Sequence, residues 1–361
     1  MSHCELPQGL AAPRGLAWAW STLACAYGQG VALRTWAYAR GWFRIQPPPC
    51  WTLSVGGLEV GGSGKTPVTA WLLAHLLAAG HRPGLLTRGY GRRSRGLRLR
   101  RPGTAALAAD LGDEPAMLVA GGLDVAIVAC GDRRRGARIL RDLGCDVLVL
   151  DDGFGHRALG RHLDLVVLRS EAPLGTGHLL PRGSLREPAS ALGRADVLLF
   201  LCKDGAPVLA PAPGAAAVEM RALAPQALWV AATAVAQPPC SWRTGAPLPL
   251  AGRRVLGATG IAQPSSFRRS LVALGVQLVG LRVYPDHHPF ATRDLAPLRQ
   301  AMVDAGAELL VVTAKDAVKL GPIWPDELGV VGLQLQLLAP AAFLARLAAS
   351  RPTAGGAALL P

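Results

Sequence analysis

The sequence predicts an α/β fold built on a doubly wound, mostly parallel sheet, followed by a second, smaller α/β domain. From Cys50 to about Leu201, apolar β-rich runs alternate with helical patterns, which is typical of doubly wound sheets. Several of these runs are continuously apolar, as expected for strands buried on both faces of a parallel sheet. The first run leads directly into a Gly-rich turn and a helical pattern over Thr66–Ala79.

The predicted elements follow from this alternation of apolar runs and turns. The strands expected in the larger domain are Trp51–Val55, Gly84–Thr87, Val125–Ala129, Val147–Leu150, Leu165–Leu168 and Val197–Leu201. In the smaller domain we expect strands over Arg254–Gly257, Gln277–Val283 and Leu309–Thr313, and helices over Ser265–Leu274 and Arg293–Asp304. The Ala- and Pro-rich stretch Ala206–Gly245 is predicted to link the two domains. The predicted divisions are 1–46, 47–235, 236–350 and a frayed tail, 351–361.

The N-terminal segment carries an uncharged stretch, Leu16–Leu33, with arginines on both sides. Four of the nine tryptophans lie in or just after it, and Pro47–Pro49 separates it from the first strand. This pattern favours a helix lying in a lipid interface. A short membrane span, a cleaved signal peptide and a buried structural helix are the alternatives.

The composition places limits on function without choosing one. The formal net charge is +14, which favours an anionic partner such as a phosphorylated substrate, an anionic membrane or a nucleic acid, although a solvated basic surface gives the same value. The seven cysteines are scattered and form no Cys-x-x-Cys pair. This spacing indicates reduced thiols in a reducing compartment and gives no sign of a structural zinc site.

The Gly-rich turn has the pattern of a phosphate-binding loop. Gly61, Gly62, Ser63 and Gly64 precede Lys65 and Thr66, between a predicted strand and a predicted helix. Glycines allow backbone N–H groups to converge on an anion, the lysine reaches the β- and γ-phosphates, and the threonine hydroxyl binds Mg²⁺. The spacing rule places Gly where this chain has Glu59. The alternative is a Gly-rich loop with a solvated lysine.

Two acids end the apolar run before residue 151, and another acid opens a helical pattern. Asp151 and Asp152 would lie at the carboxyl end of a strand, where an acid can hold Mg²⁺ directly or through water, or form a turn. Asp113 follows Gly112 and precedes Pro115. It can act as the base that accepts a hydroxyl proton, or cap the helix, and the residue types alone leave both open.

Two further clusters carry chemically useful side chains. His287 and His288 follow Asp286, which suits a proton relay, while two histidines are too few for a metal site and a surface turn is the alternative. Arg186 and Glu187 follow an apolar residue; arginine can clamp a phosphoryl group and glutamate can bind Mg²⁺, although an exposed ion pair is the alternative.

Taken together and in order, these segments resemble the tetraacyldisaccharide 4'-kinase family, the lipid A 4'-kinases of Gram-negative bacteria. The resemblance runs from about Trp51 to Lys319 and departs from the family pattern at Gly57, Glu59, Gly155 and Ala314. It rests on the motifs Val60–Pro67, Thr87–Gly91, Gly112–Pro115, Leu150–Phe154, Leu179–Pro181, Leu185–Pro188, Ala258–Pro264, Pro285–His288 and Lys315–Lys319.

The resemblance implies the remaining expectations. It implies a P-loop kinase-like core, an N-terminal membrane-associating helix, and ATP- and Mg²⁺-dependent phosphorylation of the 4'-hydroxyl of an acylated glucosamine disaccharide 1-phosphate. The enzyme would work at the cytoplasmic face of the inner membrane, against an anionic surface, with no nucleic acid and no obligate protein partner. The implied catalytic residues are Asp113 as the base, His287 as its partner, Lys65 and Arg186; Gly61, Gly62, Ser63, Gly64, Lys65 and Thr66 would bind the nucleotide, and Thr66, Asp151, Asp152 and Glu187 would bind the metal.

Two other functions remain compatible with the motifs. A P-loop kinase for another small metabolite would keep the nucleotide machinery and change the acceptor. A non-catalytic, nucleotide-dependent binding protein or GTPase-like switch that acts on nucleic acid would fit the positive net charge. However, Lys315-Asp316 lacks the spacing of a guanine-reading loop, and the chain has no basic stripe studded with aromatic residues.

Overall fold

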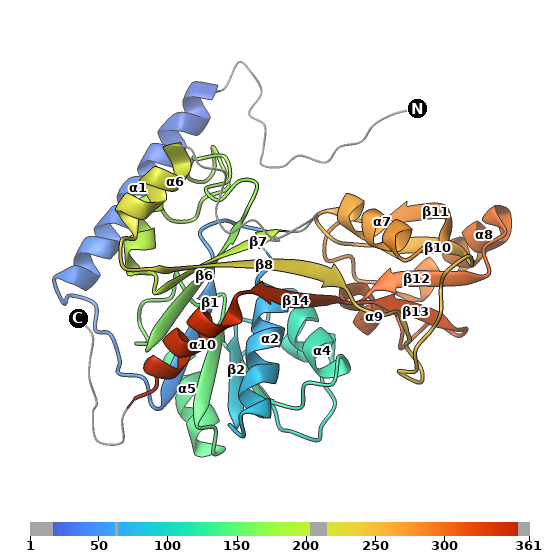
Figure 1. Ribbon diagram of the computed structural model, residues 1–361, viewed down its shortest axis with the longest axis horizontal. Helices are drawn as coiled ribbons and strands as arrows, with labels where there is room; N and C mark the ends of the chain where they lie inside the picture. The colour runs from blue at the N-terminus through green and yellow to red at the C-terminus, as the bar shows by residue number, and fades with distance from the viewer. Residues whose placement is uncertain (1–16, 62–63, 203–214, 353–361) are drawn as a thin grey trace. The chain divides into compact units, whose positions relative to one another are not determined.

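The computed structural model describes residues 17–61, 64–202 and 215–352 (Figure 1). Contacts within the chain divide these residues into two compact units. The described part of the first unit comprises residues 17–61, 64–65, 147–202, 215–233 and 337–352, and the second comprises 66–146 and 234–336. The chain passes from the first unit to the second between residues 233 and 234, close to the predicted domain boundary at 235. However, the predicted core domain, 47–235, contributes residues to both units. The predicted division into domains therefore stays a prediction.

The strands of the first unit are parallel and apolar. Neighbours follow the order β8 (Leu228–Ala236), β7 (Val197–Cys202), β6 (Leu163–Arg169), β1 (Trp51–Gly56) and β5 (Val147–Asp151). β1, β5 and β7 are buried along their whole length, as the continuously apolar runs predict. Because Val55 pairs with Asp151, the end of β1 lies beside the first of the two acids.

Helices and a buried cluster complete this unit. Its helices are α1 (Ala17–Ala39), η2 (Ala189–Arg194), α6 (Ala215–Leu223) and α10 (Pro340–Ala349), the last following β14 (Leu333–Leu338). One buried cluster joins side chains of β6 and β7 to the loops that follow β1 and β5, and it includes Leu58, Phe154, Phe200 and Met220. Both loops that carry predicted site residues therefore rest on packed apolar side chains.

The second unit contains a three-strand group. β2 (Pro83–Thr87) and β4 (Ala126–Ala129) are parallel, and β3 (Arg98–Arg100) pairs antiparallel with β4. The accompanying helices are most of α2 (Lys65–Ala78), α3 (Ala108–Leu111), α4 (Asp113–Ala120) and α5 (Arg133–Asp142). The side chain of Asp132 caps α5 by accepting hydrogen bonds from the backbone N–H groups of Arg134 and Arg135.

The second unit also contains a five-stranded sheet. Its order is β11 (Gln277–Val283), β10 (Arg254–Thr259), β12 (Leu309–Thr313), β13 (Leu328–Val331) and β9 (Cys240–Ser241), with only β9 antiparallel to its neighbour. The helices α7 (Pro264–Ala273), α8 (Leu295–Ala305) and α9 (Ala314–Leu320) alternate with these strands along the chain (Figure 1). The short helix η3 (Thr292–Asp294) leads into α8. The predicted strands and helices of the smaller domain are confirmed with small shifts at their ends.

The linker predicted over Ala206–Gly245 is wrong for its described part. This segment contributes the helix α6, the strand β8 and the short strand β9. The many alanines masked the pattern, because alanine is a weak signal for strands although it packs well where the sheet is already covered. Residues 206–214 and the tail from 353 onward lie outside the described residues.

The described part of the N-terminal segment contains the helix α1, over Ala17–Ala39, with large apolar side chains on its surface. Trp18 is 71% exposed, and Trp42, which stacks edge-on against Trp36, is 72% exposed. Within the described residues, no helix combines the length and the apolar character that a membrane crossing demands.

A close approach at the end of β1 predicts that Gly56→Ala destabilises the protein. A methyl group there would lie 2.4 Å from Phe154 Cβ and 2.7 Å from its backbone nitrogen, and backbone cannot rotate away. We expect a loss of about 1–3 kcal/mol in the free energy of unfolding, measured by urea denaturation. Gly131→Ala is the matched control, because an added Cβ meets nothing within 4 Å; equal losses in both variants would contradict the packing argument.

Candidate functional site

The described part of the loop after β1 contains two glycines with positive φ angles, at the positions that the Gly-rich pattern predicts. Gly61 and Gly64 have φ angles of 95° and 85°, which other residues rarely adopt. Helix α2 begins at Lys65, so its N-terminus follows the glycines directly. Gly62 and Ser63, which the sequence also assigns to the loop, lie outside the described residues.

The acid at the start of this loop is neutralised locally. The carboxylate of Glu59 is buried and accepts two hydrogen bonds from the guanidinium of Arg169, both at 3.1 Å. The hydroxyl of Ser184 donates a third, at 2.7 Å. Glu59 therefore carries its own counter-charge and joins the end of β1 to the end of β6 and to the loop before Arg186.

Asp152 brings together two cations that the sequence assigns to phosphate chemistry. Both of its oxygens accept hydrogen bonds from Arg186, at 2.5 and 2.6 Å, and Lys65 Nζ lies 3.6 Å from Oδ1. Asp152 has a φ of 49°, a backbone conformation that non-glycine residues rarely adopt, which often marks functional turns. Lys65, Asp152 and Arg186 thus form one cluster in the first unit.

The other predicted metal-binding acids lie differently. Asp151 is buried as the last residue of β5. Glu187 is also buried, and its two oxygens pair with Arg34 of α1 at 2.9 Å and with Arg194 of η2 at 2.5 Å. In this arrangement Glu187 orders two arginines; its assignment as a metal ligand stays a prediction.

Helix α1 contacts the segment that carries Arg186. Besides the Arg34–Glu187 ion pair, the hydroxyl of Tyr27 donates a hydrogen bond to the carbonyl of Arg186 at 2.9 Å. Helix α1 therefore holds both Arg186, which pairs with Asp152, and the next residue, Glu187.

Asp113 does not cap its helix. Gly112 occupies the N-cap position of α4, and Asp113 is the first helical residue, with its side chain turned to other partners. The capping interpretation is therefore wrong, because the carboxylate is engaged by side chains from far along the chain. The position still places an acid at a helix N-terminus, which favours the negative charge.

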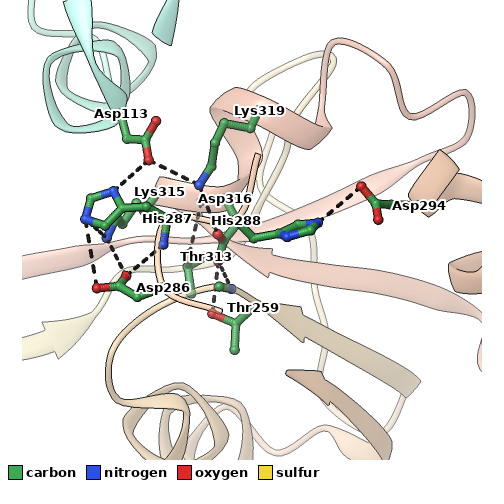
Figure 2. Close-up of polar contacts among 11 residues, drawn as sticks. Asp113, Thr259, Asp286, His287, His288, Asp294, Thr313, Lys315, Asp316 and Lys319 are labelled. Carbon is green, nitrogen blue, oxygen red and sulfur yellow. Dashed lines mark hydrogen bonds and ion pairs between the residues drawn. The ribbon is translucent and has the colours of Figure 1, made fainter. Parts of the chain in front are cut away.

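A histidine and a lysine hold the Asp113 carboxylate (Figure 2). His287 Nδ1 lies 3.0 Å and Lys319 Nζ 3.2 Å from the same oxygen, Oδ2. Burial opposes ionisation of this carboxyl, but the bond from His287 and the charge of Lys319 outweigh it and hold the pKa of Asp113 below its ordinary value. Tyr90 packs edge-on against the His287 ring, with centroids 4.9 Å apart.

The structure separates the roles of the two histidines. His288 Nε2 lies 3.2 Å from Asp294, and its ring stacks on Tyr284, so both partners of His288 are residues close to it in the sequence. His287 has a φ of 60° and is the histidine that contacts Asp113. Within the described residues, no group of three or more His, Cys, Asp or Glu is arranged to hold a metal ion.

Helix α9 contributes residues to which the sequence argument assigned no role (Figure 2). Lys315 Nζ lies 3.1 Å from His287 Nε2 and 3.0 Å from Asp286. The fully buried Asp316 accepts hydrogen bonds from the side chains of Thr259 and Thr313 and from the backbone of Gly260. The available signal was the spacing: two of the four lysines stand four residues apart on one short helix.

Comparison with known proteins gives one consistent family. Residues 16–351 match the family model described as tetraacyldisaccharide-1-P 4'-kinase. A protein named tetraacyldisaccharide 4'-kinase from Anaeromyxobacter dehalogenans is 41% identical over 325 residues, covering 85% of this chain and 83% of its own length. Another with that name, from Geobacter metallireducens, is 37% identical over 330 residues, covering 89% and 94%.

A solved structure agrees with these matches. The crystal structure of LpxK from Aquifex aeolicus in complex with ATP superposes with a TM-score of 0.71 at 25% sequence identity. The superposition covers 93% of this chain and all of that chain. The predicted α/β fold of the P-loop kinase type is therefore confirmed, whereas the roles of individual site residues stay predictions.

The Glu59 cluster predicts that its charge partners are coupled. Glu59→Gln leaves the Arg169 guanidinium without its counter-ion, so we expect a loss of about 1–3 kcal/mol in the free energy of unfolding. The free energy of unfolding is measured by thermal or urea denaturation for Glu59→Gln, for Arg169→Met and for the variant that carries both changes, which completes a double-mutant cycle. The double variant should regain part of the loss; purely additive effects would show that the ion pair does not stabilise the loop.

Proposed function

The chain belongs to the tetraacyldisaccharide-1-P 4'-kinase family, and we propose that it transfers the γ-phosphoryl group of ATP to the 4'-hydroxyl of a tetraacylated glucosamine disaccharide 1-phosphate. The membership is carried by matches over most of the chain and of its relatives. For the chemistry, the observation that carries the proposal is the engaged carboxylate of Asp113, bonded to His287 and kept ionised.

In this proposal the loop after β1, the start of α2 and Arg186 bind the nucleotide. The N–H groups of the loop after β1 and the N-terminus of α2 favour the polyphosphate, and Lys65 supplies a point charge. Arg186, a planar guanidinium already ordered by Asp152, stabilises the charge that develops on the transferred group. An anionic ligand competes with Asp152 for both cations.

The residues assigned to the metal have suitable chemistry. Thr66 offers a hydroxyl and Asp151 a carboxylate, and Mg²⁺ takes oxygen ligands of this kind. When bound, Mg²⁺ neutralises charge on the β- and γ-phosphates. Asp152 would join this set only if it released Arg186, so Asp151 is the better candidate for a direct ligand.

Asp113 supplies the base for the acceptor alcohol. The acceptor O–H bond breaks and its proton passes to the carboxylate, while the oxygen bonds to the γ-phosphorus. The bond from phosphorus to the bridging oxygen breaks, and ADP leaves with that electron pair. His287 orients the carboxylate through its Nδ1 bond.

The acceptor is a lipid, and α1 is suited to meet it at the surface of a membrane. Tryptophans and other large apolar side chains lie exposed along and after this helix, and arginines flank them. These features favour a helix lying in the interface of an anionic membrane. We assign the protein to the cytoplasmic face of the inner membrane, where ATP is available.

The decisive assay supplies purified protein in detergent with ATP, Mg²⁺ and the disaccharide 1-phosphate. A product phosphorylated at the 4' position supports the proposal. Its absence, while a competent family enzyme is active in the same assay, rejects it. Turnover of a water-soluble sugar instead would favour a P-loop kinase with another acceptor.

Lys65→Ala should reduce kcat by about 10²–10³-fold, because a fixed cation at the transferring phosphate is lost. The mass of 4'-phosphorylated product formed per minute measures this. Arg182→Ala removes an exposed charge from the same unit and should leave the rate unchanged. Near-normal turnover by Lys65→Ala would reject the phosphate-cradle interpretation.

Asp113→Asn should reduce kcat by about 10²–10⁴-fold while leaving the KM for ATP nearly unchanged, since a base acts in the chemical step. Asp110→Asn is the matched control, because Asp110 is an exposed acid paired with Arg98. Equal losses in kcat and in nucleotide affinity would argue against a base.

A further inference from the structure

The further inference concerns α9, which the proposed function leaves without a role. We propose that Lys319 is a positioning residue: it holds Oδ2 of Asp113 as a fixed counter-ion, so that Oδ1 is the oxygen that receives the proton of the acceptor hydroxyl. This inference rests on the proposed function, because it refines the work of the same base.

The first argument is the choice of oxygen. His287 Nδ1 and Lys319 Nζ both approach Oδ2 of Asp113, at 3.0 and 3.2 Å. Among the hydrogen bonds of the described residues, none reaches Oδ1. A carboxylate held twice at one oxygen cannot rotate without breaking both bonds, which leaves Oδ1 in one direction, ready to accept a proton.

The second argument is the direction of each hydrogen bond. A lysine ammonium only donates, so Lys315 makes Nε2 of His287 an acceptor. The ring hydrogen then resides on Nδ1 and is donated to Asp113. The histidine therefore acts as a donor to the carboxylate, and Lys319 adds a fixed positive charge beside Asp113.

The third argument is that the Lys319 side chain is itself buried and held in place by an acid. Its side chain is only 9% exposed, and Nζ lies 3.7 Å from Asp316 Oδ1, three residues earlier on α9. Asp316 is fully buried and bonds the backbone N–H of Gly260, whose carbonyl accepts the backbone N–H of His287 at 3.0 Å. One buried acid thus fixes both partners of Asp113 (Figure 2).

The charges around Asp113 favour its anionic form. From α9 it faces Lys319, from the turn after β11 it faces His287, and from the loop after β2 the phenol of Tyr90 lies against that histidine. Lys315, Asp286 and Asp316 form the next layer, in which the two acids each pair with a lysine. Lys319 is the only fixed cation in direct contact among the described residues.

Removal of this cation has a definite sign. Asp113 must be ionised to accept a proton, so activity falls at low pH as the carboxyl becomes protonated. Lys319→Met keeps the length of the side chain and removes its charge, so the pKa of Asp113 should rise and the acid limb of the kcat profile should move to higher pH. The KM for ATP should stay within about threefold.

The experiment follows the carboxyl directly as well as the rate. Full-length protein labelled with ¹³C in its aspartate carboxyl groups is titrated by NMR, and Asp113→Asn identifies the signal. We expect the Asp113 signal of Lys319→Met to titrate at higher pH than in the unchanged protein and kcat to fall at least about tenfold, with Lys319→Arg regaining much of both. Arg253→Met, which removes a partly exposed charge paired with Glu308 in the same unit, should change neither.

The outcomes separate this inference from the proposed function. An unmoved titration of Asp113 in folded Lys319→Met overturns the inference, whatever acceptor the enzyme uses. If Lys319→Met does not fold, Lys319→Gln replaces it in the same titration: an Asp113 signal that titrates at higher pH together with a lowered kcat supports the inference, and an unmoved signal overturns it. Failure of the unchanged protein on the lipid acceptor rejects the function while leaving the titration result interpretable.

Discussion

The parallel pairing of β1 with β5 is the constraint from which the nucleotide chemistry follows. The carboxyl ends of two parallel strands lie at the same edge of the sheet. Because Val55 of β1 pairs with Asp151 of β5, the Gly-rich loop after β1 and the two acids at the end of β5 lie side by side. Gly56 tightens this edge, since only a residue without a side chain fits against the backbone of Phe154.

Buried acids and their cations form the second layer of organisation. Glu59 pairs with Arg169, Glu187 with Arg34 and Arg194, and Asp113 with Lys319. Taking one partner away leaves a desolvated charge, so these clusters specify geometry more than they add stability. Because a one-to-one pair such as Glu59–Arg169 or Asp113–Lys319 carries no net charge, these clusters leave the basic excess of the sequence almost unchanged.

The sequence predicted the elements whose signal is local, and it missed those whose signal is not. Long apolar runs and Gly-rich turns identified the central strands and the loop around Lys65, and each strand of the smaller domain predicted from such a run is present. β8 was missed because it is rich in alanine, which has a low intrinsic preference for strands. Its strand conformation depends on packing within the sheet, which the sequence does not show. The partner of Asp113 came from a family resemblance, and residue types alone could not choose between base and helix cap, since the deciding contacts join residues about 170 to 200 positions apart. For the same reason Lys319 could be recognised as part of a family motif, but the sequence alone could not assign it a function.

The link between α1 and Arg186 shows how an interfacial helix can affect phosphate chemistry. Tyr27 holds the carbonyl of Arg186, and Arg34 holds the carboxylate of the next residue, while the Arg186 guanidinium clasps Asp152. A displacement of α1 must break these bonds or carry the backbone of Arg186 with it. Because the exposed tryptophans lie on and just after this helix, the residues that would meet lipid are connected through two side chains to a cation that would meet phosphate. The helix therefore serves as part of the frame that orients Arg186, in addition to any contact it makes with a membrane.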